Sequence, residues 1–159
     1  MEYLITYGWA LLVIFIVIAA LVVINPISTP ASCSFPSGFG CPNIPAIDKS
    51  GNLYVRVVNS NNNEINVLQA ICTADKTAVP PQWAALSTHS VSVARQDILF
   101  IDTDTGLNHL AAKCCRADGC TYQAGEEFTG KLWLLYRNSE DPSSYPNRTV
   151  SGIISTKIG

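Results

Sequence analysis

Charged residues are scarce in this sequence, and cationic residues are missing from its start. Only 14% of the 159 residues are charged, and the ten lysines and arginines are scattered singly. A nucleic-acid-binding protein gathers such residues on one face, so we expect no nucleic acid partner. No lysine or arginine precedes Lys49, so the positive charge that usually orients a membrane anchor is also lacking.

Signatures of the common enzyme classes are absent as well. The sequence contains no G-x-S-x-G, H-E-x-x-H, phosphate-binding P-loop or dinucleotide glycine fingerprint. We therefore expect a protein that is not an enzyme, with no cofactor and no catalytic or cofactor-binding residues. The two histidines, His89 and His109, lie in polar surroundings typical of loops, and neither receives a role.

One acidic segment has some likeness to a metal-binding loop. The run Asp102-Thr103-Asp104-Thr105-Gly106 is similar to the start of a calcium loop, but its glycine stands one position early. Lys113 also occupies the place where the bidentate glutamate belongs. The segment therefore predicts a plain turn, and no metal ligand is predicted.

All six cysteines follow residue 24, in a region rich in turns: Cys33, Cys41, Cys72, Cys114, Cys115 and Cys120. A metal site is the alternative to disulfides, but no C-x-x-C pair occurs and neither histidine stands at zinc-ligand spacing from them. Three disulfides are expected, and six cysteines allow 15 pairings. The sequence favours the local closures Cys33–Cys41 and Cys115–Cys120, which would leave Cys72 to join Cys114.

Residues 4–24, LITYGWALLVIFIVIAALVVI, contain neither charge nor proline. As a helix rising 1.5 Å per residue, this run matches the hydrocarbon core of a bilayer, about 30 Å thick. Pro26 and Pro30 should end the helix near Ile24. A secretory signal peptide is the alternative, but it needs a positively charged start and a shorter apolar core.

The predicted helix is apolar on every side, so it must be buried all round, in lipid or among neighbouring helices. The small residues Gly8, Ala10, Ala19 and Ala20 would let such helices approach closely. Glu2 has two interpretations. It could sit at the interface, favoured by the helix dipole, or it could neutralise a positive amino terminus on an adjacent subunit.

The run from Glu2 to Ile14, EYLITYGWALLVI, resembles the start of archaeal type IV pilins that carry a class III signal peptide. The resemblance covers about the first 25 residues. It implies cleavage by a prepilin peptidase ahead of the helix, contact with pilus assembly machinery, and a role in assembly for Glu2, Tyr3 and Trp9. In that family several residues and a basic cleavage region precede the glutamate, whereas only Met1 precedes Glu2 here.

The rest of the chain predicts a disulfide-stapled β head. Five prolines in residues 25–52 indicate a linker. Segments rich in β-branched and aromatic residues predict strands at 53–58, 65–72, 91–94, 98–101, 131–137 and 150–158. The polar tract 59–64 suits a hairpin turn, and the continuous apolar run 132–136 suits a central strand.

The expected fold is therefore α+β, with a long N-terminal apolar helix followed by a mainly antiparallel β-sandwich. The predicted divisions are a membrane or filament-core helix at 1–25, a Pro/Gly-rich linker at 26–52 and an extracellular head at 53–159. Asn147-Arg148-Thr149 is an acceptor for N-glycosylation if that head is exported.

These features predict a structural subunit of an extracellular filament on the cell surface, a homopolymer inserted in the membrane before assembly. Its helices would form the core, and its heads would serve adhesion or surface contact. A filament for motility is an option within the same class. The alternative is a single-pass membrane-anchored surface protein that binds a partner and does not polymerise.

Overall fold

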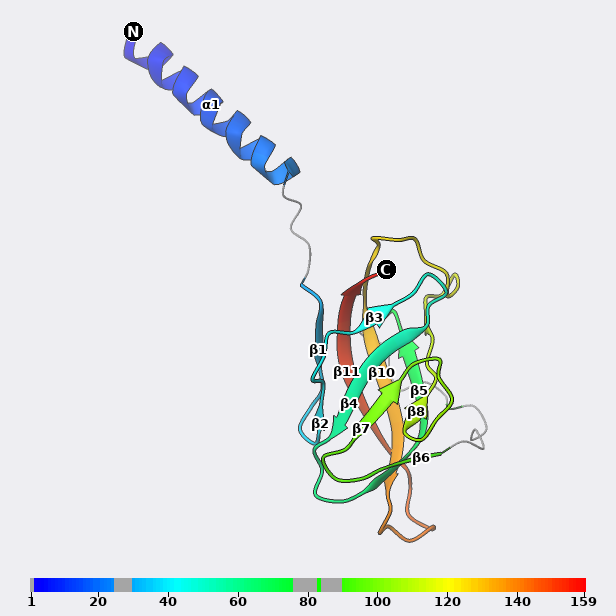
Figure 1. Cartoon of the computed structure of the whole chain (residues 1–159). Helices are drawn as coiled ribbons and strands as arrows, with labels where there is room; N and C mark the ends of the chain where they lie inside the picture. The colour runs from blue at the N-terminus through cyan, green and yellow to red at the C-terminus, as the bar shows by residue number, and fades with distance from the viewer. Residues whose placement is uncertain (1, 25–29, 76–82, 84–89) are drawn as a thin grey trace.

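The computed structural model describes residues 2–24, 30–75, 83 and 90–159, and within the helix it describes side chains from Tyr7 to Val23 (Figure 1). The elements, in chain order, are α1 (Glu2–Ile24), β1 (Ser32–Ser34), β2 (Phe39–Gly40), β3 (Ala46–Ile47), β4 (Leu53–Asn59), β5 (Ile65–Thr73), β6 (Val91–Val93), β7 (Ile98–Ile101), β8 (His109–Leu110), β9 (Cys114–Cys115), β10 (Glu127–Asn138) and β11 (Arg148–Lys157).

Two sheets form the head. One has the order β1-β11-β10-β5-β6 with β9 added beside β5, and the other has the order β2-β4-β7-β8 with β3 added beside β4. Most neighbouring strands are antiparallel, and the pairs β5–β9 and β7–β8 are parallel. The two layers and the helix that extends away from them are visible in Figure 1.

Alternating side chains place the core between the two sheets. Along β4, Leu53, Val55 and Val57 are buried, while the residues between them are more exposed. They form one cluster with buried residues of the other sheet such as Val67 and Leu134. This alternation is the pattern of strands with one face on a core.

Strand β10 differs because it is covered on both faces. It pairs with β11 along one hydrogen-bonding edge and with β5 along the other edge. The four consecutive residues from Leu132 to Leu135 are all buried. The continuous apolar run thus marks the central strand, as predicted.

The predicted strands are present, with ends that shift by a few residues at most. Strand β7 has the predicted bounds, and β10 extends the prediction at both ends. The polar tract after β4 joins it to β5 in the other sheet, so it does not form the expected hairpin. Five short strands were not predicted: β8 and β9, and also β1, β2 and β3 within the predicted linker.

Part of the predicted linker belongs to the head. Strands β1, β2 and β3 all fall within residues 26–52 and pair with β11 or β4. Prolines mark turns here, but the intervening residues still complete sheet edges. The head therefore begins at β1, earlier than the predicted boundary at residue 53.

The three expected disulfides are present, and they join Cys33 to Cys41, Cys72 to Cys114 and Cys115 to Cys120. These are the pairs that the sequence favoured. Cys72 and Cys114 also lie opposite each other in the β5–β9 pair. This disulfide therefore fastens the long segment after β8 to the six-stranded sheet.

Two predictions about the fold class are corrected. The described part of the chain is mostly β with a single helix, so the α+β class is wrong. Among the residues that the structure describes, no helix combines the length and the hydropathy of a membrane-crossing segment. This finding corrects the prediction that a long helix over residues 4–24 spans a membrane; α1 occupies this part of the chain.

A carboxylate organises the turn between β3 and β4. Asp48 accepts hydrogen bonds from the backbone N–H groups of Ser50 and Asn52 and from the Asn52 side chain, at 2.7–2.9 Å. Gly51 in this turn has φ +78°, and a Cβ there would lie 2.4 Å from the carbonyl oxygen of Cys120. The turn thus needs a glycine and rests directly on the backbone of the Cys115–Cys120 loop.

We expect Asp48→Ala to lower the free energy of unfolding by about 1–2 kcal/mol at neutral pH, because three donors lose their acceptor. Burial acts to raise the pKa of Asp48, but the hydrogen bonds from Asn52 and Ser50 outweigh it and hold that pKa below its usual value. A carboxyl with a lowered folded-state pKa stabilises the protein above its unfolded-state pKa, and this is lost as pH falls through the folded-state value. Urea unfolding of both proteins between neutral pH and roughly pH 2 should therefore show the difference shrinking. The exposed Asp118, changed to alanine, is the control, and a pH-independent difference for Asp48→Ala would contradict this account.

Candidate functional site

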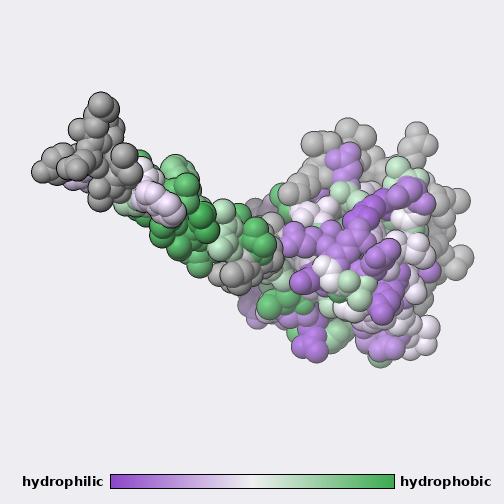
Figure 2. All heavy atoms as spheres, turned by 90° about the horizontal axis from the view of Figure 1, so that it is seen from above, coloured by the Kyte–Doolittle hydropathy of each residue, from purple (hydrophilic) through white to green (hydrophobic). Residues whose placement is uncertain are grey.

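Helix α1 presents apolar side chains on every side. Of its large apolar residues between Tyr7 and Val23, Leu12 is the least exposed at 50% and Val23 the most exposed at 80%. Figure 2 shows this hydrophobic surface leading away from a head whose visible face is largely hydrophilic. A contiguous exposed apolar surface of this kind marks an interaction site.

The predicted assembly residues lie on this helix. Trp9, Ala10, Ala19 and Ala20 are exposed, and apart from the local helix backbone no described atom lies within 4 Å of a Cβ built on Gly8. Glu2 and Tyr3 belong to α1, but their side chains lie outside the described residues. The structure of one chain therefore leaves the predicted assembly surface open, and its role stays a prediction.

The outer face of the sheet that contains β4, β7 and β8 carries a row of planar side chains. Arg56 on β4 lies opposite Phe100 on β7, which lies opposite His109 on β8. The Arg56 guanidinium lies 5.5 Å from the centre of the Phe100 ring. The rings of Phe100 and His109 stack with centroids 4.9 Å apart and an interplanar angle of 12°. This row fixes the plane of the imidazole.

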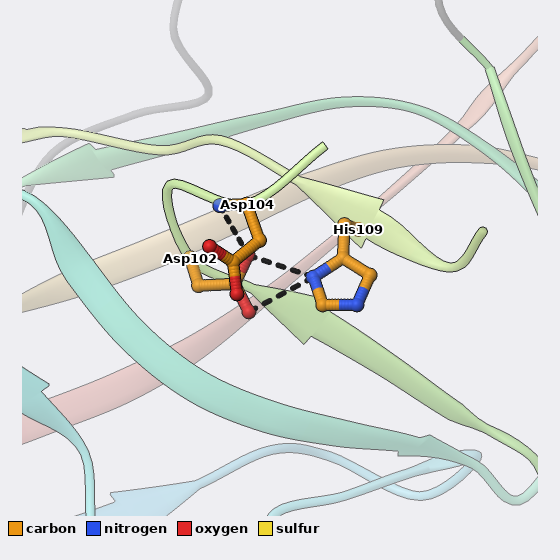
Figure 3. A group of neighbouring side chains, drawn as sticks. All are labelled: Asp102, Asp104 and His109. Carbon is orange, nitrogen blue, oxygen red and sulfur yellow. Dashed lines mark hydrogen bonds and ion pairs between the residues drawn. The ribbon is translucent and has the colours of Figure 1, made fainter. Parts of the chain in front are cut away.

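His109 also faces two aspartates at the end of β7 (Figure 3). Its Nδ1 lies 2.8 and 3.0 Å from the two carboxylate oxygens of Asp102. The backbone N–H of Asp104 donates to Asp102 Oδ1 at 3.0 Å. One ligand atom from each of the three residues lies within 4.8 Å of the others. Asp102 and His109 are half-buried, and Asp104 is exposed.

The sequence analysis missed this cluster. It compared residues 102–106 with a calcium loop and gave His109 no role. The available signal was the D-x-D-x₄-H spacing between Asp102 and His109, which brings ligands together only if the chain turns back beside β7. In the structure the chain does turn back, and β8 pairs in parallel with β7, with Phe100 beside His109 and Ile101 beside Leu110.

The predicted glycosylation acceptor lies on the surface. Asn147 is exposed and directly precedes β11, and its neighbour Arg148 forms an ion pair with Asp141 at 3.1 Å. The position leaves room for a bulky hydrophilic group. Modification of Asn147 stays a prediction.

No known protein family matches the chain's sequence, and no curated protein matches it either. No described helix is long and apolar enough to cross a membrane, as noted above. These findings correct the identification with archaeal type IV pilins, which is wrong. The resemblance of residues 2–14 is therefore only a short local similarity.

Proposed function

We propose that this protein is a structural subunit of an extracellular filament. The α1 helices of many copies would pack together as the core, and the β heads would face outward for adhesion or surface contact. The single observation that carries this proposal is the exposure of apolar side chains on every side of α1. The proposal gives the protein no catalytic role.

Association of copies through α1 would remove this surface from water. Complete burial of one Val, Leu or Ile side chain contributes about 1.5–3 kcal/mol, and α1 exposes such residues along its whole described length. Because they surround the helix, one partner would leave some of them in water. Several neighbouring helices are needed to cover all sides, and contacts that repeat without closing generate an open helical filament.

The head is suited to an oxidising environment outside the cell. Its six cysteines are paired in three disulfides, and disulfides persist mainly in exported proteins. Its visible face is largely hydrophilic (Figure 2). These features support placing the head on the outside of the filament, where its outer faces would meet surfaces or partners.

The proposal is tested on material sheared from cells that produce the protein. Negative-stain electron microscopy should show filaments, and mass spectrometry should identify this chain as their main subunit. Recovery of the chain only as a monomer that remains with the cell membranes, without filaments, would overturn the proposal. That result would favour the anchored surface protein that does not polymerise.

A further inference from the structure

We propose that Asp102, Asp104 and His109 form a binding site for a divalent transition-metal ion, with Zn²⁺ as the expected ion. The site lies on the outer face of the head, on the β7–β8 connection, and does not depend on the proposed filament.

The donor atoms are already gathered. One ligand atom of each residue lies within 4.8 Å of the other two, before any ion is present. Zinc ligands stand about 2.0–2.2 Å from the metal, so donor atoms around one ion lie roughly 3–4 Å apart. Small rotations of the exposed Asp104 side chain would complete this spacing. The ion would take the place of the direct hydrogen bond between Asp102 and His109.

The donor types favour a particular class of ion. Calcium and magnesium prefer oxygen ligands alone, whereas an imidazole nitrogen with carboxylate oxygens suits zinc and its neighbours. Three protein ligands leave a tetrahedral zinc ion one open position. Water or a group on a contacted surface could fill that position.

The surroundings hold two of the three ligands in place. The His109 ring stacks on Phe100, which in turn lies against the Arg56 guanidinium. Asp102 accepts the backbone N–H of Asp104, and a second hydrogen-bonding partner of this kind orients a metal ligand. Ligands that are oriented beforehand lose less freedom when the ion binds.

The ion would also close the connection between β7 and β8. Parallel neighbours usually need a crossover of about a dozen residues or more, but residues 102–108 alone join these two strands. Asp102 stands at the start of this loop and His109 at its end. An ion between them would fix the loop that carries Leu107, which is 95% exposed.

The alternative is a simple Asp102–His109 ion pair that binds no metal. A substitution of Asp104 distinguishes this alternative from a metal site. In the ion pair, Asp104 contributes only its backbone N–H, which donates to Asp102, and asparagine keeps this group. A metal site needs the Asp104 carboxylate. Asp104→Asn should therefore weaken metal binding, while it leaves the Asp102–His109 pair in place.

Isothermal titration calorimetry of the disulfide-bonded full chain with Zn²⁺ should find one ion bound per chain. All described cysteines are paired, so no thiolate competes. His109→Gln and Asp104→Asn should each weaken binding at least about tenfold, equivalent to about 1.4 kcal/mol. The matched controls are His89→Gln, which removes the other histidine, and Asp118→Asn, which removes an exposed carboxylate elsewhere.

Absence of Zn²⁺ binding by the unmodified chain would overturn the proposal. Unchanged affinity in either His109→Gln or Asp104→Asn would overturn it too, since each removes a ligand. Circular dichroism and thermal unfolding verify that the variants fold, and Asp104 is exposed, so its change should leave the fold intact. Zn²⁺ should also raise the Tm of the unmodified chain and of both controls, because a ligand that binds only the folded state stabilises it.

Discussion

Ile14→Lys is expected to abolish self-association of the chain. Ile14 lies in the middle of α1 and is 53% exposed, so lysine fits the single chain without a clash. Lysine is also a good helix former, so α1 should persist. In a filament core, however, an unpaired ammonium would be removed from water, and this costs several kcal/mol in every subunit. Sedimentation velocity and negative-stain microscopy should find monomers where the unmodified chain forms polymers.

Ile44→Lys is the matched control for this change. Ile44 lies on the head and is 68% exposed, so the same substitution adds the same charge away from α1. It should assemble normally. Gly8→Leu is a second variant without added charge. Because a Cβ at Gly8 meets no described atom within 4 Å apart from the local helix backbone, a defect in assembly would point to contacts between chains. Polymers formed by Ile14→Lys and Gly8→Leu alike would contradict packing through α1.

The main strands could be predicted because their signals are local. Strands β4 and β7 contain alternating or β-branched residues bounded by polar tracts, and such patterns depend on few distant contacts. The continuous apolar run of β10 predicted its central place for the same reason. Disulfide pairing was predictable too, because two pairs are close in sequence and the third follows by elimination.

The short strands were beyond prediction because tertiary partners define them. Strand β1 exists only as the neighbour of β11, and β9 only as the neighbour of β5. The Asp102–His109 contact depends in the same way on the parallel pairing of β7 with β8. The pilin resemblance failed for a different reason. A similarity confined to residues 2–14 is compatible with a helix, but it covers too little of the chain to identify a family.

Replacing both Cys72 and Cys114 by alanine is expected to lower the free energy of unfolding by about 4 kcal/mol. Their disulfide closes a loop of 42 residues, and the entropy of the unfolded chain that such a link removes corresponds to about this value. Both residues are buried, and they hold β9 against β5. Since the free energy of unfolding of a domain is about 5–15 kcal/mol, this change would remove a large part of it. Urea unfolding followed by circular dichroism measures the change.

The matched control replaces Cys115 and Cys120 by alanine. This disulfide spans only five residues, so the same relation gives about 2 kcal/mol. Cys115 and Cys120 are also half-buried rather than buried, so less packing is lost. The two effects should not add in a chain that lacks both disulfides, because Cys114 and Cys115 are adjacent and their loops share neighbours. An equal or larger loss from the Cys115–Cys120 variant would contradict the argument, since both loop length and burial predict the opposite order.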